Sequence, residues 1–361
     1  MKKVGLLTLN GLSNFGNRLQ NFAIQEVVKQ YGFNIETISN EYSVYNKAYK
    51  RRAKTFIKNC ISPFIFWDKR YLRYSKFLKF DRKIKYSKFL IDKDHIPENL
   101  DKNYDTFLVG SDQVWNPTFG RMSDIDFLTF AQKDKRNSIS ASFGINNIPE
   151  DMKELYADRL KNFNYISVRE DRAEEIIKEL TGREDVEVLI DPTMALDSTS
   201  WKQHENRPRQ LKNSKYILQY FLGNVPEEVK TQMATFAKEE NCIIIDVLDK
   251  NEKFYNIGPS EFLYLERNAH LICTDSFHSC VFAILFNRPF LVFERQDSNV
   301  NMSSRITTLL TKFKLEERKY RGKIDRDSLK TDYRVTNQIL QKEREKFNCF
   351  IERCLKSGEK I

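Results

Sequence analysis

The chain has 361 residues, 40% of them hydrophobic, which exceeds the size at which one core usually stops growing, so we expect two domains. No apolar run approaches the about 20 residues that a bilayer-spanning helix needs, which argues against a transmembrane segment. The net charge of +10 predicts an anionic partner, either nucleic acid, an acidic membrane surface or a phosphorylated substrate.

The first half of the chain alternates predicted strands and helices. Residues 4–9 form an apolar strand pattern, residues 18–31 carry apolar positions at helical spacing, and Gly32 ends that helix. Further strands are expected at 33–38, 106–109, 138–143, 165–168 and 186–190, and further helices at 149–163 and 171–180. This alternation predicts a parallel sheet with right-handed crossovers.

The second half repeats this alternation after a polar segment at 197–215. Strands are expected at 216–222, 242–248, 271–274 and 290–293, and helices at 226–240, 259–268, 277–287 and 304–313. We therefore expect an α/β fold with two facing Rossmann-like domains, at 1–197 and 198–330, and a long amphipathic C-terminal helix at 331–361. A ligand is expected between the carboxyl ends of the two sheets.

A basic aromatic insertion at about 42–100 interrupts the N-terminal domain. Between residues 46 and 93, lysine and arginine far outnumber aspartate, and aromatic residues are interspersed among them. Such a segment suits the surface of an anionic membrane, but it equally suits a solvated basic helix whose aromatic rings pack on the protein. No recognised nucleic-acid-binding module is present, so we do not expect nucleic acid as a partner.

Cysteine usage and the N-terminus point to the cytoplasm. The six cysteines are scattered and include no CxxC pair, so neither a zinc site nor a disulfide framework is predicted. The initial MKKVGLLTLN is expected to form the first strand, because it does not resemble a signal peptide with a cleavage site.

Polar clusters follow five of the predicted strands. They occupy residues 13–17, 110–113, 169–172, 191–193 and 274–279. The carboxyl ends of parallel strands meet at one edge of a sheet, and helix N-termini there favour anions. The candidate site residues are therefore Asn17, Gly110, Ser111, Asp112, Arg169, Asp191, Asp275, Ser276 and His278.

Arg169 and His278 are the candidates for binding an anion. A guanidinium at a strand end can bind carboxylate or phosphate through two parallel hydrogen bonds, although Arg169 could instead pair with Glu170 or a neighbouring helix. His278 could hold a phosphate or transfer a proton, but it could also be a buried histidine bonded to Asp275 or to a backbone carbonyl.

Two aspartates are candidate general bases. Asp112 could act on substrate or could cap a helix before Val114, and Asp191 could act on substrate or could simply end a strand. Cys273 and Cys280 lie close to His278 in sequence, but their apolar neighbours favour inert packing over a nucleophilic role.

With these clusters the chain resembles the polysaccharide pyruvyl transferase family. The matching segments are NFGNRLQNFAIQ at 14–25, FLVGSDQVWNP at 107–117, SVREDRA at 167–173, IDPTMAL at 190–196 and TDSFHSCVFAILFNRPFLVF at 274–293. The resemblance implies two Rossmann-type halves, as in GT-B glycosyltransferases. It also implies transfer of pyruvate from phosphoenolpyruvate to two sugar hydroxyls, as a cyclic ketal, with release of phosphate and no requirement for a metal or a further cofactor.

The resemblance transfers unevenly to individual residues. Arg169 matches the arginine of the family's Ser-x-Arg-Asp segment, and His278 matches the histidine of its Arg-Leu-His-Gly segment. This chain has Ser276 at the arginine of the second segment and Ser279 at its glycine. A cation expected for phosphoenolpyruvate is therefore missing, and the candidates to replace it are Arg288, Arg295 and Arg305.

The resemblance implies a cytoplasmic transferase that acts in exopolysaccharide synthesis. Its acceptor would be a sugar, which could be linked to polyprenyl diphosphate, and the basic aromatic insertion could then contact the inner face of an anionic membrane. Two alternatives stay open. One is a GT-B glycosyltransferase that uses a nucleotide-sugar, and the other is a non-catalytic binding module in polysaccharide assembly.

Overall fold

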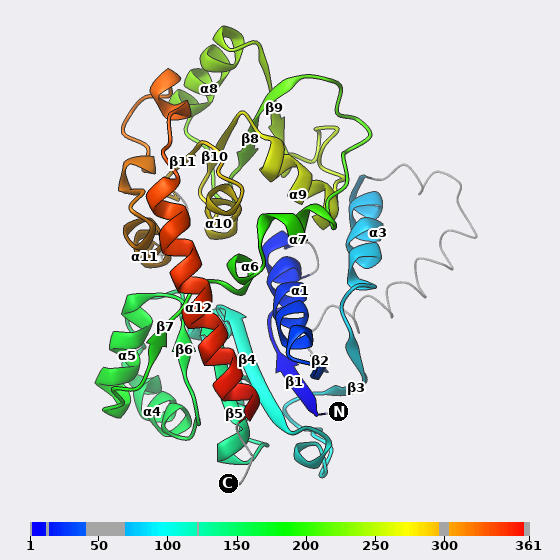
Figure 1. Ribbon diagram of the computed structural model, residues 1–361, viewed down its shortest axis with the longest axis vertical. Helices are drawn as coiled ribbons and strands as arrows, with labels where there is room; N and C mark the ends of the chain where they lie inside the picture. The colour runs from blue at the N-terminus through cyan, green and yellow to red at the C-terminus, as the bar shows by residue number, and fades with distance from the viewer. Residues whose placement is uncertain (1, 12–13, 41–68, 121–122, 296–302, 357–361) are drawn as a thin grey trace, which may run out of the picture. The chain divides into compact units, whose positions relative to one another are not determined.

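A computed structural model of the chain describes residues 2–11, 14–40, 69–120, 123–295 and 303–356. These residues form two compact units. Unit 1 contains the described residues up to 40 together with 81–195 and 342–356, and unit 2 contains 69–80, 196–295 and 303–341. Each unit is built around its own sheet (Figure 1).

Unit 1 contains a seven-stranded parallel sheet in the order β3-β2-β1-β4-β5-β6-β7. Its strands are β1 (Lys3–Leu7), β2 (Asn34–Asn40), β3 (Tyr86–Ile91), β4 (Thr106–Asp112), β5 (Arg136–Ala141), β6 (Ser167–Val168) and β7 (Glu187–Val188). The sheet grows in one direction from β1 and in the other from β4. The gap between the carboxyl ends of these two strands is the topological switch point, where open α/β sheets bind ligands.

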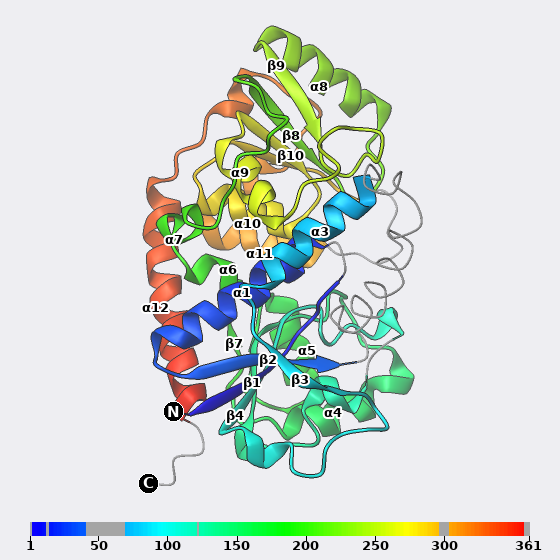
Figure 2. The ribbon, with the colours of Figure 1, turned by 90° about the vertical axis from the view of Figure 1, so that its right-hand side faces the viewer.

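Helices cover both faces of this sheet. They are α1 (Phe15–Gln30), α4 (Lys153–Lys161), α5 (Asp171–Thr181), α6 (Pro192–Ala195) and the last part of α12 (Arg334–Lys356). Figures 1 and 2 place α1 and α12 over one face and α4 and α5 over the other. Asn14 caps α1 by accepting a hydrogen bond from the backbone N–H of Asn17, and Gly182 ends α5 with a φ of 72°.

The last part of α12 completes unit 1 through apolar and polar contacts. Phe347, Phe350 and Ile351 are buried, and the Tyr165 ring meets the Phe350 ring edge-on. Arg344 donates to the Met194 carbonyl at 2.7 Å, and Lys346 donates to the Val188 carbonyl at 3.0 Å. These contacts hold the last part of α12 against α6 and the edge strand β7.

Unit 2 contains a four-stranded parallel sheet in the order β11-β10-β8-β9. Its strands are β8 (Lys215–Tyr220), β9 (Cys242–Asp246), β10 (Leu271–Thr274) and β11 (Phe290–Val292). Its helices are α7 (Ser198–Lys202), α8 (Glu227–Glu239), α9 (Pro259–Asn268), α10 (Phe277–Leu285), α11 (Ser303–Phe313) and all but the last residue of α3 (Lys69–Asp81). The switch point of this sheet lies between β8 and β10.

Short 3-10 helices complete the described structure. They span Asp101–Asn103, Pro117–Phe119, Asp124–Phe127, Lys133–Lys135, Glu150–Met152, Glu316–Arg318 and Arg326–Leu329.

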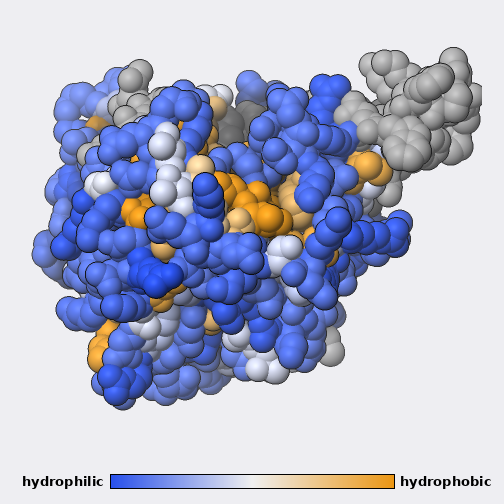
Figure 3. Space-filling model, turned by 90° about the horizontal axis from the view of Figure 1, so that it is seen from above, coloured by the Kyte–Doolittle hydropathy of each residue, from blue (hydrophilic) through white to orange (hydrophobic). Residues whose placement is uncertain are grey.

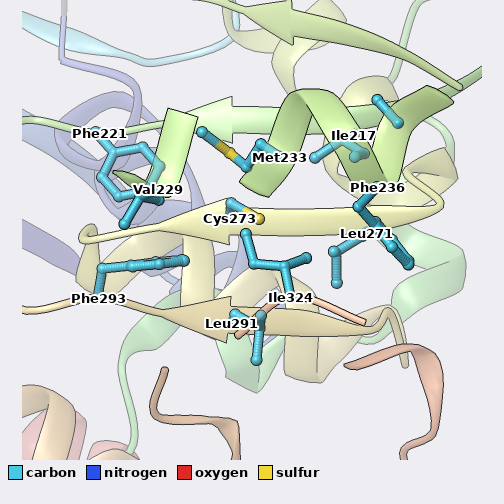
Figure 4. Packing of buried hydrophobic residues seen from close by; sticks show 11 residues of the cluster. Ile217, Phe221, Val229, Met233, Phe236, Leu271, Cys273, Leu291, Phe293 and Ile324 are labelled. Carbon is cyan, nitrogen blue, oxygen red and sulfur yellow. The ribbon is translucent and has the colours of Figure 1, made fainter. Parts of the chain in front are cut away.

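The core of unit 2 forms between α8 and one face of its sheet (Figure 4). Met233 and Phe236 of α8 are buried against Leu271 and Cys273 of β10, and Phe293 closes one end of the cluster. Burying each large apolar side chain contributes about 1.5–3 kcal/mol. The same burial raises the pKa of the Cys273 thiol, which agrees with inert packing and not with a nucleophilic role.

The α/β architecture with two parallel-sheet units and a long C-terminal helix is confirmed. Two details differ from the prediction. Unit 2 resumes at residue 196 instead of 198, and the C-terminal helix is divided between the two units at 341/342 instead of standing apart. The helix starts at Arg334, a few residues after its predicted beginning.

The described part of the basic aromatic insertion is integrated into the fold, while its residues 42–68 lie outside the described ranges. β3 is an edge strand of the first sheet. On α3, Arg73 is buried and donates to the carbonyls of Val247 at 3.0 Å and Tyr255 at 2.8 Å, and Lys76 pairs with Glu261 at 2.7 Å. These two basic residues of α3 thus pack on unit 2.

The surface seen in Figure 3 is mostly hydrophilic, with apolar residues gathered in a small central area. Across the described residues, no helix combines the length and the apolar character that crossing a membrane requires.

Candidate functional site

In unit 1, Asn17 and Asp112 bridge the switch point of the seven-stranded sheet. Asn17 lies in the first turn of α1, which follows β1, and Asp112 is the last residue of β4. The Asn17 side-chain amide donates to the Asp112 carboxylate at 2.5 Å, while its own oxygen accepts the Gly11 N–H at 3.1 Å. The two polar groups therefore lie where this topology binds ligands.

Arg169 follows β6 and lies between two carboxylates. Its terminal nitrogens donate to Asp112 at 3.0 Å and to Asp191 at 2.8 Å, and all three side chains are almost completely buried. Burial by itself lowers the pKa of the guanidinium, but the charges of Asp112 and Asp191 outweigh it and the pKa is raised. With both carboxylates ionised, the three groups would together carry one net negative charge.

The two aspartates differ in exposure, and Asp191 is the more deeply buried. One oxygen of Asp191 accepts from the backbone N–H and the hydroxyl of Thr193, at 3.0 and 2.7 Å. The other oxygen accepts from Arg169 at 2.8 Å, and the Ser111 hydroxyl oxygen lies 3.4 Å from it. These donors hold the Asp191 carboxylate in place. Asp112 retains 6% exposure against 1% for Asp191.

β4 ends with Gly110, Ser111 and Asp112, and the backbone at Gly110 leaves no room for a Cβ. Gly110 has a φ of 125°, and a Cβ there would lie 2.2 Å from the Ile139 carbonyl oxygen. Ser111 donates its N–H to the Gln20 side chain at 3.0 Å and its hydroxyl to the Ser140 carbonyl at 3.0 Å. Gly110 and Ser111 thus fix the backbone that presents Asp112, which has a φ of 66°.

The partner of Arg169 differs from the one that its neighbouring sequence suggested. Glu170 does not form the alternative ion pair. Its carboxylate accepts from the Ser142 hydroxyl at 2.7 Å and from the N–H groups of Phe143 at 3.2 Å and Gly144 at 3.4 Å. The helix-cap alternative for Asp112 is also wrong, because its carboxylate bonds Asn17 and Arg169 and residues 113–116 are not helical.

In unit 2, Asp275 bridges the equivalent switch point. It follows β10, and its two oxygens accept the backbone N–H groups of Leu222 at 2.7 Å and Gly223 at 2.8 Å, which follow β8. Arg295, which follows β11, donates to the same carboxylate at 3.2 Å. Asp275 therefore ties together the ends of the strands, and its charge is shared with Arg295.

His278 lies in the first turn of α10. Ser276 is the N-cap residue, and its N–H donates to the Thr274 hydroxyl at 3.0 Å. The His278 ring is 8% exposed and meets the Phe277 ring edge-on at 5.5 Å. The guanidinium of Arg305, on α11, lies 5.8 Å from the centre of the Phe277 ring. Histidine and arginine thus gather at the positive end of a helix dipole.

The residue after His278 binds a buried acid that the sequence analysis missed. The Ser279 hydroxyl donates to Glu266 of α9 at 2.6 Å, and Glu266 is completely buried. Its second oxygen has no hydrogen-bond partner among the described residues. Burial raises the pKa of the Glu266 carboxyl well above its usual range. A glutamate on the apolar face of the 259–268 helix was the available signal.

The structure thus gathers the predicted residues into two clusters. Asn17, Gly110, Ser111, Asp112, Arg169 and Asp191 lie together in unit 1, and Asp275, Ser276 and His278 lie together in unit 2. Their roles toward substrate remain predictions. Within the described part of the chain, no group of three or more histidine, cysteine or acidic side chains is placed to hold a metal ion.

Comparison with known proteins gives one family match. A family model described as polysaccharide pyruvyl transferase matches residues 14–298, which covers both clusters. None of the curated proteins matches this chain.

Solved structures share the general architecture at low sequence identity. The UDP-GlcNAc 2-epimerase of Methanocaldococcus jannaschii is 13% identical, with a TM-score of 0.49 and coverage of 94% of this chain and 99% of that one. The Anabaena protein Alr3699/HepE, solved in complex with UDP and glucose, is 8% identical, with a TM-score of 0.46 and coverage of 99% and 100%.

Proposed function

Because this chain belongs to the polysaccharide pyruvyl transferase family, we propose that it transfers pyruvate from phosphoenolpyruvate to a sugar of a bacterial cell-surface polysaccharide or its lipid-linked precursor. Two sugar hydroxyl oxygens form bonds to the same carbon of the enolpyruvyl group, and the bond from that carbon to the phosphate oxygen breaks. The proton lost by one hydroxyl is matched by the proton that the methylene carbon gains. The proton lost by the other hydroxyl leaves with the phosphate. The family match carries the proposal, and the geometry supports the residue roles proposed below.

Asp112 is the base that the geometry supports best. It lies at the switch point, it is more exposed than Asp191, and the Arg169 guanidinium favours its charged form. A carboxylate in this position would remove a proton from an attacking sugar hydroxyl, a contribution of about 10²–10⁴-fold to the rate. Asp191 accepts from Thr193 and Arg169 and is less exposed, which suits a residue that holds the arginine in place.

Arg169 has two possible roles that experiment can separate. Direct binding of phosphoenolpyruvate by Arg169 stays a prediction. It would require the anion to displace Asp112 or Asp191 from a guanidinium nitrogen. The observed pairs support a second role, in which Arg169 keeps Asp112 ionised and in position. In that role Arg169 is a positioning residue.

The α10 end in unit 2 suits the anionic donor. His278, protonated beside a phosphate, would stabilise the departing phosphate or donate a proton to it. The first-turn N–H groups of α10 and its dipole favour the same negative charge. Ser276 and Asp275 shape the turn that presents these groups.

The acceptor and location complete the proposal. A sugar carried on polyprenyl diphosphate would place the reaction at the cytoplasmic face of the membrane, which the excess of lysine and arginine supports through attraction to anionic lipid. Liposome flotation with and without anionic lipid tests this part. If the protein does not bind anionic vesicles, the proposed membrane contact is refuted, but the proposed reaction is not.

The decisive experiment for the reaction uses the full-length chain with phosphoenolpyruvate and a lipid-linked saccharide. We expect phosphate release that depends on the acceptor, together with acid-labile pyruvate on the product. The Asp112→Asn and His278→Ala variants should lose this activity, while an exposed change such as Lys153→Ala should not. Thermal stabilisation by UDP-sugars alone, with no phosphate released from phosphoenolpyruvate, would refute the proposal in favour of a glycosyltransferase.

A further inference from the structure

A buried acid joins α9 to the turn of α10 that carries His278. The Ser279 hydroxyl donates to one oxygen of Glu266 at 2.6 Å, and both side chains are completely buried. Glu266 lies near the end of α9, and Ser279 directly follows His278 in the first turn of α10. This hydrogen bond therefore fixes the residue next to His278 to a neighbouring helix.

The Glu266 carboxyl is costly to bury where it lies. Its second oxygen has no hydrogen-bond partner among the residues that the structure describes. Nearby, the Phe262 ring of α9 meets the Phe282 ring of α10 edge-on at 6.4 Å, and Cys280 is completely buried. A buried polar group with an unpaired atom costs free energy, because water no longer solvates it.

An apolar pair would hold α9 and α10 together at lower cost. Replacing both members of a buried polar pair with apolar groups of similar shape is often neutral or stabilising. The Glu266–Ser279 pair supplies direction instead, because a hydrogen bond restricts the distance and angle between the two helices, whereas apolar contacts tolerate small shifts. The pair thus favours one position of the first turn of α10.

From this geometry we propose that Glu266 is a positioning residue for donor binding, which acts through Ser279 to fix the turn that presents His278 and the first N–H groups of α10 to phosphoenolpyruvate. The inference rests on the proposed function. Glu266 does not touch the donor, since it is completely buried. Burial raises the pKa of its carboxyl and so favours the neutral form, which adds no negative charge close to an anionic ligand.

The double variant Glu266→Leu, Ser279→Ala separates positioning from stability. Both partners become apolar, so urea unfolding should show a stability equal to or above that of the wild type. Calorimetric titration of the full-length protein with phosphoenolpyruvate, without acceptor, should nevertheless show binding weakened about 10-fold, because hydrogen bonds to the donor depend on alignment. A folded double variant that binds phosphoenolpyruvate as the wild type does would overturn the proposal.

The single variant Ser279→Ala gives the same test with a smaller change in volume, in case the double variant does not fold. It removes the hydrogen bond and should weaken binding of phosphoenolpyruvate by a similar factor of about 10. Wild-type affinity in folded Ser279→Ala would refute the role of the Glu266–Ser279 hydrogen bond.

A rescue variant and a matched control complete the test. Glu266→Gln keeps an oxygen that accepts from Ser279, so its affinity should stay within about twofold of the wild type. Phe236→Leu removes volume from the core of unit 2 on α8, and it should lower stability without changing affinity. If Glu266→Gln loses as much affinity as the double variant, or if Phe236→Leu weakens binding equally, the positioning role is wrong.

Failure of this assignment is distinguishable from failure of the proposed function. If the wild type binds and consumes phosphoenolpyruvate and the double variant binds it equally well, only the role of Glu266 is refuted. If the wild type does not bind phosphoenolpyruvate, the proposed function fails, and the role of Glu266 fails with it.

Discussion

Replacing Glu266 with glutamine should remove a pH dependence from the stability of unit 2. Glu266 is completely buried, accepts one hydrogen bond from Ser279 at 2.6 Å, and has its pKa raised well above 4.5. The folded protein therefore holds a proton on Glu266 at pH values where the unfolded chain has released it. Glutamine keeps the shape and can accept the same hydrogen bond, but it does not titrate.

The sign and size of the effect follow from proton linkage. A folded pKa that is raised contributes stability that is fully present below the unfolded pKa and is lost as pH rises towards the folded pKa. Each pH unit in that window removes about 1.4 kcal/mol. As the pH rises from the unfolded pKa towards the raised folded pKa, the wild type should therefore lose stability relative to Glu266→Gln, because the other titrating groups are the same in both proteins.

Urea unfolding at pH 5, 6 and 7 provides the measurement. Tryptophan fluorescence reports unfolding, because Trp201 is buried in unit 2 against the Phe282 ring and Trp115 is buried in unit 1. The exposed Glu239→Gln change on α8 is the matched control and should follow the wild-type slope. If the free energy of unfolding changes with pH in parallel for the wild type and Glu266→Gln, Glu266 does not stay protonated in the folded protein.

Three further changes test the cluster in unit 1. Arg169→Ala should destabilise the protein by about 3–5 kcal/mol in urea unfolding, because Asp112 and Asp191 would be left buried without their cation; wild-type stability would contradict the ion pairs. Gly110→Ala should cost at least about 2–3 kcal/mol by thermal unfolding, since its Cβ would lie 2.2 Å from the Ile139 oxygen, and an unchanged melting temperature would exclude this close approach. Asp112→Asn should lower acceptor-dependent phosphate release by about 10²–10⁴-fold with the fold retained, and a variant with full activity would rule out Asp112 as the base.

Most of the fold was predictable because strand and helix periods are local. The apolar residues at 4–9 and 271–274 predicted β1 and β10, and the pattern at 259–268 predicted α9 with the observed bounds. The insertion was harder to interpret. Lysine and aromatic residues at 86–91 concealed β3, because an edge strand tolerates charge on its exposed face and so lacks an apolar run.

The candidate site was predictable in its members but not in their pairings. Strand-end position brought Asn17, Asp112, Arg169 and Asp191 together, since parallel strands end at one edge of a sheet. The sequence placed Glu170 next to Arg169, and only the three-dimensional fold turns that carboxylate towards Ser142. Side-chain direction at a strand end depends on the neighbouring strands, so proximity in the chain could not identify Asp112 and Asp191 as the partners of Arg169.

The discontinuity of unit 1 sets an order of events during synthesis. Its sheet is formed by residues before 196, but the buried α12 residues Phe347, Phe350 and Ile351 come much later in the sequence. At about 5–20 residues per second, the ribosome makes all of residues 196–341 before the part of α12 that packs on unit 1 is synthesised. We therefore expect the surface of unit 1 that these residues cover to stay exposed for many seconds during synthesis.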